Sequence, residues 1–298
     1  MRTKGSCVRV APRALKGAVI RSFFLLETFL NTVKPQILLT NDDGILSPGL
    51  WAAAAALEEI GYVHVVAPRE QSSGMGRSLP STSSGIIQPQ LLTVNGREWT
   101  VYAVDGTPAQ AVLHGIFEIV PRKPDLVVSG INYGENLGIG VTVSGTVGAA
   151  MEGATAGIPS LAISLETKIE HHLSYSEEVD FSAAAYFSAY FGKLLLERKF
   201  PADMDVLKVD VPANATHQTP WELTYISRVR VFESVPPQRT TWDQPARVGY
   251  RFSDELYQAP EGSDVHTLRV KRRVSVTPLS LNITSRADFS EIETILRS

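Results

Sequence analysis

Cysteine is almost absent from this chain: Cys7 is the only one among its 298 residues. An intramolecular disulfide is therefore impossible, and the composition gives no support for a thiol nucleophile. Chains without disulfides are typical of reducing compartments, so we expect a cytoplasmic protein.

The sequence also lacks an apolar run long enough to cross a bilayer. Near the N-terminus, the apolar stretch 17–26 resembles a signal or transit peptide, but Arg21 interrupts it, Glu27 ends it, and no small-residue cleavage site follows. A spanning helix needs about 20 consecutive apolar residues. We expect residues 1–33 to be an N-terminal extension, either preceding a true start near Val33 or peripheral and poorly ordered, and we expect no membrane partner.

A strong charge of one sign is missing as well, since the net charge is only −3. Residues 1–34 hold seven basic side chains and one acid, which leaves 21 basic and 30 acidic residues and a net charge of −9 in the remainder. A body this acidic is poorly suited to bind the backbone of a nucleic-acid polymer. It is compatible with a single nucleotide held through a metal ion.

What the chain does contain is a regular alternation of strand and helix patterns. Strand patterns at 37–40, 62–66, 125–129 and 160–164 alternate with helical patterns at 51–59, 107–119 and 146–156, and Asn95-Gly96 marks a hairpin. This order predicts an α/β fold, Rossmann-like and three-layered, with a mostly parallel sheet covered on both faces.

The expected organisation is a Rossmann-like core over residues 34–200 followed by a C-terminal part over 201–298. A long helical pattern at 176–198 closes the core, and strand patterns at 206–211 and 274–277 and a helix at 288–297 follow. Between them the chain is rich in Pro, Gln, Thr and Arg. We expect an irregular β-rich extension whose arms contact a partner subunit.

The most informative residues are two adjacent acids, Asp42 and Asp43, which directly follow the buried strand pattern at 37–40. Ligands of open α/β sheets bind outside the carboxyl ends of the strands. Two neighbouring carboxylates repel each other unless a cation lies between them, and oxygen ligands suit Mg²⁺ or Mn²⁺. The alternative is a solvated Asp-Asp-Gly turn without a ligand.

Polar residues follow three of the expected strands: the segments 41–44, 67–74 and 129–138. In a parallel sheet these loops open on one edge, where a hydroxyl, an amide oxygen and two carboxylates can meet one cation. A fourth segment, Ser144-Gly145-Thr146, opens a helix of small residues, and helix N-termini hold phosphate well. Ordinary helix capping by Ser or Thr is the alternative explanation.

In combination these motifs resemble the SurE family of survival-protein nucleotidases. The resemblance runs in order over about residues 36–165 and rests on five motifs, which are Asn41-Asp42-Asp43-Gly44 with Ser47-Pro48-Gly49, Ala67-Pro68 leading to Ser73-Gly74, Asp105-Gly106-Thr107-Pro108, the segment 124–132, and Ser144-Gly145-Thr146-Val147 followed by 150–153. It implies a metal-dependent acid phosphatase, a 5′-nucleotidase that acts on nucleoside 5′- and 3′-monophosphates and on short polyphosphate.

The resemblance also implies roles for individual residues. It implies one divalent ion, Mg²⁺ or Mn²⁺, on Asp42, Asp43, Ser73 and Asn132, with the two aspartates as the catalytic pair. It implies a phosphate pocket lined by Asn41, Asn136, Ser144, Gly145 and Thr146. It further implies a homodimer or homotetramer assembled through the C-terminal arms.

The C-terminal part departs from the family's pattern. The segment 274–279 fits the family's closing strand, but Arg272-Arg273 replaces the Gly-Tyr that usually precedes it, and Asp264 matches the upstream acid. This departure bears on substrate range and assembly rather than on the metal site. We expect His64 and the pair His171-His172 to be structural.

Two other functions fit part of the pattern. An aspartyl-phosphate phosphatase would use Asp42 as the nucleophile, although the Asp-x-Asp spacing of such enzymes is absent. A non-enzymatic nucleotide-binding protein on the same fold would bind nucleotide without releasing phosphate.

Overall fold

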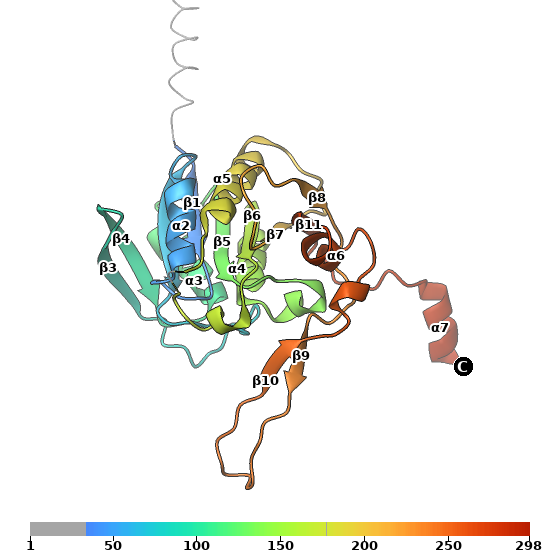
Figure 1. Cartoon of the computed structure of the whole chain (residues 1–298). Coiled ribbons are helices and arrows are strands. Elements are labelled where there is room, and N and C mark those ends of the chain that lie inside the picture. Colours follow the sequence, from blue (N-terminus) through green and yellow to red (C-terminus); the bar gives the residue numbers. More distant parts are fainter. Residues whose placement is uncertain (1–33, 177) are drawn as a thin grey trace, which may run out of the picture. The chain divides into compact units, whose positions relative to one another are not determined.

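The computed structural model describes residues 34–176 and 178–298, so the expectation for residues 1–33 lies outside the described residues. Its centre is a nine-stranded sheet with the strand order β3-β4-β2-β1-β5-β6-β7-β11-β8, seen in Figure 1. The strands are β1 (Gln36–Thr40), β2 (Tyr62–Pro68), β3 (Ile87–Val94), β4 (Arg97–Val104), β5 (Leu126–Tyr133), β6 (Ser160–Leu165), β7 (Val206–Val211), β8 (Trp221–Leu223) and β11 (Val274–Leu279).

The sheet is mostly parallel, as predicted. β4, β2, β1, β5, β6 and β7 run in one direction. β3 is antiparallel to β4, and β11 is antiparallel to β7 and parallel to β8. The predicted α/β class with a parallel central sheet is therefore confirmed.

Helices cover both faces of this sheet. α2 (Pro48–Leu57) and α5 (Ser182–Glu197) pack on one face, and α3 (Pro108–His114) and α4 (Gly145–Thr155) pack on the other. Successive side chains of β1 alternate between the two cores: Ile37 and Leu39 face α2 and α5, while Leu38 faces α3. Burying each of these side chains contributes about 1.5–3 kcal/mol, so β1 is anchored from both sides up to the point where its polar tip begins.

β5 extends further than the sequence indicated. The strand pattern in the sequence covers residues 125–129, but the strand continues to Tyr133, with a change of register against β6 between Ser129 and Asn132. Glycine is needed here for close approach: a Cβ at Gly130 would lie 2.2 Å from the backbone oxygen of Ile163. The glycine therefore reflects packing between strands rather than the end of one.

Other boundaries differ by a turn or more. α5 begins at Ser182 rather than near 176, and α3 ends at His114 and continues as a π-helical turn, Gly115–Ile119. Four short elements had no clear sequence pattern: the single-turn 3₁₀ segments Ile169–His171 and Leu256–Gln258, the longer 3₁₀ segment Gly138–Val143, and the helix α6 (Asp264–Arg269). α7 (Phe289–Arg297) matches the expected final helix.

The sheet crosses residue 200, where we placed the end of the core. β7, β11 and β8 extend it, and residues 35–298 form one compact unit. Outside this sheet, β9 (Phe232–Val235) and β10 (Gly249–Phe252) pair as an antiparallel hairpin that projects as an arm in Figure 1. Residues 201–298 thus supply both sheet strands and an arm. Among the described residues, no helix combines the length and apolarity needed to span a membrane.

Caps at two helix starts differ. Ser47 occupies the N-cap of α2, but its hydroxyl does not cap the helix and has no partner within the described residues. Thr107 forms a full capping box with Gln110 at the start of α3, and its hydroxyl donates to the backbone oxygen of Ser78 at 2.7 Å. This bond anchors the loop that follows β2.

Gly49 generates a test of how α2 is seated on the sheet. A Cβ at Gly49 would lie 2.2 Å from the backbone oxygen of Ile131, so Gly49→Ala should displace α2 and lower the free energy of unfolding by about 1–3 kcal/mol, although alanine is the better helix former. Urea unfolding measures this. Ala55→Ser, at an exposed position of α2, is the control and should stay within about 0.5 kcal/mol. Equal stability of Gly49→Ala and wild type would contradict this packing.

Candidate active site

The carboxyl ends of β1, β2 and β5 lie side by side, because β1 pairs in parallel with both other strands. Thr40, the last residue of β1, pairs with Ser129 of β5, and Leu39 pairs with Val65 of β2. The loops that follow β1 and β2 and the end of β5 therefore meet at one edge of the sheet, as the sequence predicted.

Asp42 lies against the N-terminus of α4. Its side chain is almost fully buried, and the hydroxyl of Thr146 donates to its Oδ1 at 2.5 Å. A Cβ at Gly145 would lie 2.7 Å from the Asp42 Oδ2, so only glycine leaves room for the carboxylate here. Burial raises the pKa of Asp42, while the Thr146 hydroxyl and the backbone N–H groups of Thr146 and Gly145 favour the ionised form and oppose that rise.

Asp43 is held by three neighbouring segments. Its Oδ2 accepts the backbone N–H of Tyr133 at 3.1 Å, and its Oδ1 accepts the Gln71 side-chain amide at 3.2 Å. The Tyr175 hydroxyl donates to its backbone oxygen at 2.8 Å. Burial, and secondly the negative charge of Asp42, raise the pKa of Asp43 well above its usual range. The pair is therefore strained electrostatically when no cation is bound.

The turn at residues 72–76, which contains Ser73, is bonded both to the Asp42 loop and to the segment that precedes α4. The N–H of Ser72 donates to the backbone oxygen of Asp42 at 2.7 Å, and the N–H of Gly76 donates to that of Val143 at 3.0 Å. The Ser73 side chain is exposed and makes no hydrogen bond within the described part of the chain. It is free to bind a ligand at this edge.

Asn132 presents an amide oxygen next to the Tyr133 contact with Asp43. Its Nδ2 donates to the backbone oxygen of Gly134 at 2.6 Å, which fixes the side chain and leaves Oδ1 as a free acceptor. Asn132 thus lies one residue from the N–H that bonds Asp43, and Ser73 lies one residue from the N–H that bonds the Asp42 backbone oxygen.

This donor set suits a hard divalent cation. Across the described residues, no group of three or more His, Cys, Asp and Glu side chains is arranged to hold a metal, so a cation here would depend on Asp42 and Asp43 together with neutral oxygens. Oxygen-only ligands, two of them charged, fit Mg²⁺ or Mn²⁺. A cation would also remove the repulsion between the two carboxylates.

The residues predicted to line the phosphate pocket differ in whether their polar atoms are already bonded within the protein. Asn41 is fully buried, and both polar atoms of its amide bond the backbone of Gly44, at 3.0 and 3.1 Å. Its role within the structure is to shape the turn that carries Asp42 and Asp43. Ser144 accepts the N–H of Val147 at 3.1 Å as the N-cap of α4, which leaves its own O–H available to a ligand.

Asn136 lies in the segment between β5 and the 3₁₀ turn. Its Nδ2 donates to the Ser164 hydroxyl at 2.9 Å, and its backbone N–H donates to the Asp210 Oδ1 at 2.7 Å. One amide N–H of the side chain stays available, and Asn136 is only partly buried.

Sequence reasoning missed the residues that support Asp43 from the far side. His172, which we expected to be structural, accepts the Gln71 amide through its backbone oxygen at 2.7 Å, and its Nδ1 lies 3.2 Å from the Tyr250 hydroxyl. Burial lowers its pKa. No local pattern could have indicated this, because the contact joins segments 101 residues apart. His64 is half-buried in β2 and bonds Gln36 at 2.8 Å, away from this site.

The basic pair Arg272-Arg273 is engaged in ion pairs. Arg272 binds Glu166 through Nη1 at 2.8 Å and Nη2 at 2.5 Å, and Arg273 pairs with Glu222. Arg272 has φ 54°, a left-handed conformation that favours glycine. Residue 272 thus has a backbone conformation that glycine adopts easily, and its arginine side chain forms an ion pair with Glu166.

The raised pKa of Asp43 predicts a stability effect in metal-free protein. The unfolded chain releases this proton near the ordinary pKa of 3.8. The folded protein therefore loses stability as the pH rises above that value, and the loss is complete once the pH exceeds the raised pKa of Asp43 in the folded state. Asp43→Asn should therefore raise the Tm of chelator-treated protein at pH 7, by roughly 2–4 °C per kcal/mol recovered. The difference should shrink at pH 4. Thermal unfolding at both pH values measures it, and a lower Tm for the variant at pH 7 would contradict the buried, repelling pair.

Comparison with known proteins identifies the family. A family model described as survival protein SurE matches residues 37–233. The 5′-nucleotidase SurE of Thermococcus gammatolerans is 42% identical over 262 residues, covering 88% of this chain and 96% of the relative. That of Archaeoglobus fulgidus is 41% identical over 260 residues, covering 87% and 96%. The crystal structure of the SurE protein from Aquifex aeolicus matches with a TM-score of 0.69 and 32% identity, over 88% of this chain and 100% of that one. The chain belongs to the SurE family.

Proposed function

We propose that this protein is a metal-dependent phosphomonoesterase that hydrolyses nucleoside 5′- and 3′-monophosphates, with short-chain polyphosphate as a further substrate. The observation that carries the proposal is the buried, adjacent pair Asp42 and Asp43 at the carboxyl edge of a parallel sheet. The curated relatives are named 5′-nucleotidases, which supports the reaction class, a hydrolase. A cytoplasmic location is part of the proposal, consistent with a single cysteine.

One divalent ion per subunit, Mg²⁺ or Mn²⁺, would be held by Asp42, Asp43, Ser73 and Asn132. Such an ion supplies positive charge for the phosphoryl group and activates water. The protein's part is to hold these oxygens in place: Thr146 fixes the Asp42 carboxylate, and the Tyr133 N–H fixes that of Asp43. Neither aspartate is assigned as a proton acceptor, because a carboxylate that binds a cation is a weak base.

Phosphate would bind between this cation site and the N-terminus of α4. The partial positive charge of the helix start favours an anion there. The Ser144 hydroxyl and the free amide N–H of Asn136 can donate to phosphate oxygens. Gly145 and Thr146 would contribute as the positive end of the helix, while their own N–H groups orient Asp42. Fixed donors of this kind stabilise the charge on a transferring phosphoryl group. Asn41 supports the pocket by holding its turn.

The proposed function is tested by phosphate release from a panel of nucleoside 5′- and 3′-monophosphates and tripolyphosphate, with Mg²⁺ or Mn²⁺ and then with chelator. We expect release that chelator abolishes, and a loss of about a hundredfold or more in Asp43→Asn. The matched control is Asp180→Asn, at an exposed acid that bonds the Ser182 N–H at the start of α5, and it should keep full activity. Phosphate release that needs no metal, or normal turnover in Asp43→Asn, would refute the metal assignment. Binding of nucleotide without release of phosphate would support the alternative of a non-enzymatic nucleotide-binding protein.

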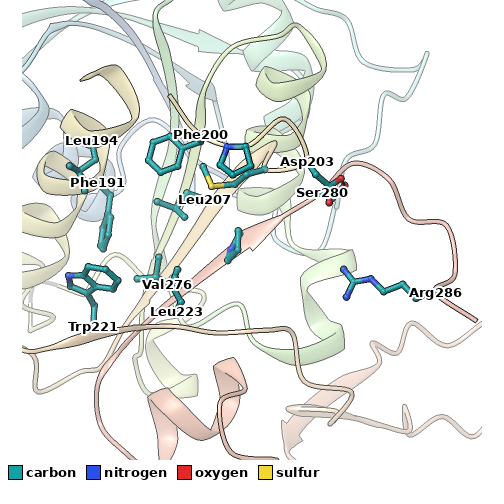
Figure 2. Close-up of a pocket in the computed structure, with 13 residues that line it drawn as sticks. Phe191, Leu194, Phe200, Asp203, Leu207, Trp221, Leu223, Val276, Ser280 and Arg286 are labelled. Carbon is teal, nitrogen blue, oxygen red and sulfur yellow. Dashed lines mark hydrogen bonds between the residues drawn. The ribbon is translucent and has the colours of Figure 1, made fainter. Parts of the chain in front are cut away.

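The protein also carries an apolar groove remote from these residues. It has a volume of about 560 Å³ and lies beside α5 and the outer strands β8 and β11, as Figure 2 shows. Its lining is mostly apolar and includes Phe191, Leu194, Phe200, Leu207, Trp221 and Val276. Exposed apolar surface of this kind commonly marks a protein–protein contact.

The helix α7 has the surface that such a groove would accept. None of its residues is buried, and its exposed side chains include Phe289, Ile292, Ile295 and Leu296. The chain that forms one wall of the groove, through Pro278, Ser280 and Arg286, leads directly into α7. We propose that α7 of a second copy fills this groove and that the β9–β10 arm adds to the contact, giving a homodimer or homotetramer.

Removal of the apolar face of α7 tests this assembly. The double variant Ile292→Ser/Ile295→Ser should shift the protein to a monomer, because the apolar contact that holds two copies is lost. Light scattering coupled to size exclusion measures the mass. Glu293→Gln, on the same helix, is the control and should leave the mass unchanged. A monomeric wild-type protein, or an oligomer that survives the double substitution, would overturn the role of α7.

A further inference from the structure

Three ionisable side chains are fully buried in a part of the fold that the proposed reaction does not use. They are Lys208 and Asp210 on β7 and Asp264 at the start of α6, and each is 0% exposed. The Lys208 ammonium pairs with Asp210 and lies 3.4 Å from the Asp264 Oδ2. Because the loss of solvation usually cancels most of the attraction in a buried ion pair, such a group is a weak source of stability.

The hydrogen bonds of this triad converge on residues 136–138. Asp210 accepts the Asn136 N–H at 2.7 Å, and Lys208 donates to the Asn136 backbone oxygen at 2.9 Å. Asp264 accepts the Gly138 N–H at 2.9 Å through one oxygen and the Ser227 N–H at 2.9 Å through the other. The triad therefore holds the main chain on both sides of Leu137.

These contacts leave Asn136 little freedom. Its backbone N–H and C=O are both bound, and its side chain is bound to Ser164 at the end of β6. Hydrogen bonds to charged groups are roughly twice as strong as those between neutral groups. The segment around Asn136 has no regular secondary structure of its own, so the triad takes the place of the strand or helix that would otherwise fix it.

We propose that Lys208, Asp210 and Asp264 form a clamp that positions Asn136 for phosphate binding. The proposal rests on the function proposed above, in which Asn136 donates to phosphate. None of the three is expected to touch the substrate; they are positioning residues that act through the main chain of residues 136–138.

The principal test is Lys208→Met, which keeps the apolar stem and removes the ammonium group. The Asn136 carbonyl then loses its donor and the two carboxylates face each other without a cation. We expect the dissociation constant of inorganic phosphate, measured by calorimetry on the Mn²⁺-loaded protein, to rise about tenfold. The affinity for Mn²⁺ itself should change less than about twofold, because the clamp does not reach Asp42 or Asp43. In turnover assays, KM should rise with the phosphate dissociation constant.

A matched control separates positioning from stability. Leu57→Ala empties part of the core beneath α2, at a fully buried residue, and should lower Tm while leaving phosphate and Mn²⁺ affinity unchanged below the transition. Lys208→Arg keeps the charge and should restore most of the phosphate affinity lost in Lys208→Met. If Lys208→Met behaves like Leu57→Ala, with a lower Tm and wild-type phosphate affinity, the clamp is a structural feature only and the proposal is overturned.

Asp264→Asn keeps the test decisive if Lys208→Met does not fold. This variant leaves the Lys208–Asp210 pair neutral overall, yet its single amide oxygen can no longer accept from both Gly138 and Ser227. We expect a severalfold weaker phosphate affinity, measured well below the unfolding transition, and an unchanged affinity would overturn the clamp. If the wild-type protein binds phosphate but releases no phosphate from nucleotides, the proposed function is contradicted, and the phosphate affinities of the variants still decide the clamp. If the wild-type protein does not bind phosphate, the clamp itself is overturned.

Discussion

The rest of the site depends on one electrostatic constraint, the burial of two adjacent carboxylates at the tip of β1. Asp42 and Asp43 are 4% and 1% exposed, and burial and mutual repulsion raise the pKa of Asp43 well above its usual range. A fold tolerates such a pair only if surrounding groups hold both carboxylates in place. Donors from α4, from β5 and from the loop after β2 do so, and each of the three segments thereby becomes part of one site.

A second group of charged residues, largely buried, is linked by ion pairs to the segment that follows β5. Arg269 pairs with both Glu135 and Glu166, and Arg272 also binds Glu166. Burial raises the pKa of Glu135 to about 7, against the opposing effect of Arg269. Glu135 lies in the sequence between Gly134 and Asn136. The backbone oxygen of Gly134 binds the Asn132 side chain, and Lys208 binds the backbone oxygen of Asn136. Charged groups from the C-terminal third of the chain thus add to the pairing with β6 in anchoring the segment that carries both amides.

This arrangement explains which features the sequence could predict. The strand β1, the Asp42–Asp43 tip and the Ser144-Gly145-Thr146 helix start are local patterns, and parallel pairing brings them together without further information. The supports from His172, Tyr175 and Lys208 could not be predicted, because each joins the site only through tertiary contacts across more than 70 residues. Lys208 is the clearest case: a lysine in a strand ordinarily indicates a solvent-exposed face, whereas here it is fully buried.

In α4, glycines that allow close contacts with neighbouring segments occupy positions where other residues would stabilise the helix more. Gly148, in the interior of the helix, weakens it by about 1 kcal/mol relative to alanine, and another glycine, Gly145, stands at its first position. A Cβ at Gly145 would meet the Asp42 carboxylate at 2.7 Å, and one at Gly148 would meet the backbone oxygen of Gly76 at 2.4 Å. The first glycine lets the helix N-terminus reach Asp42, and the second lets the Ser73 turn close over the helix. Larger residues would make a more stable helix but would push its start away from Asp42 and from the backbone of Gly76, so the small residues of α4 follow from the need to bring these segments into contact.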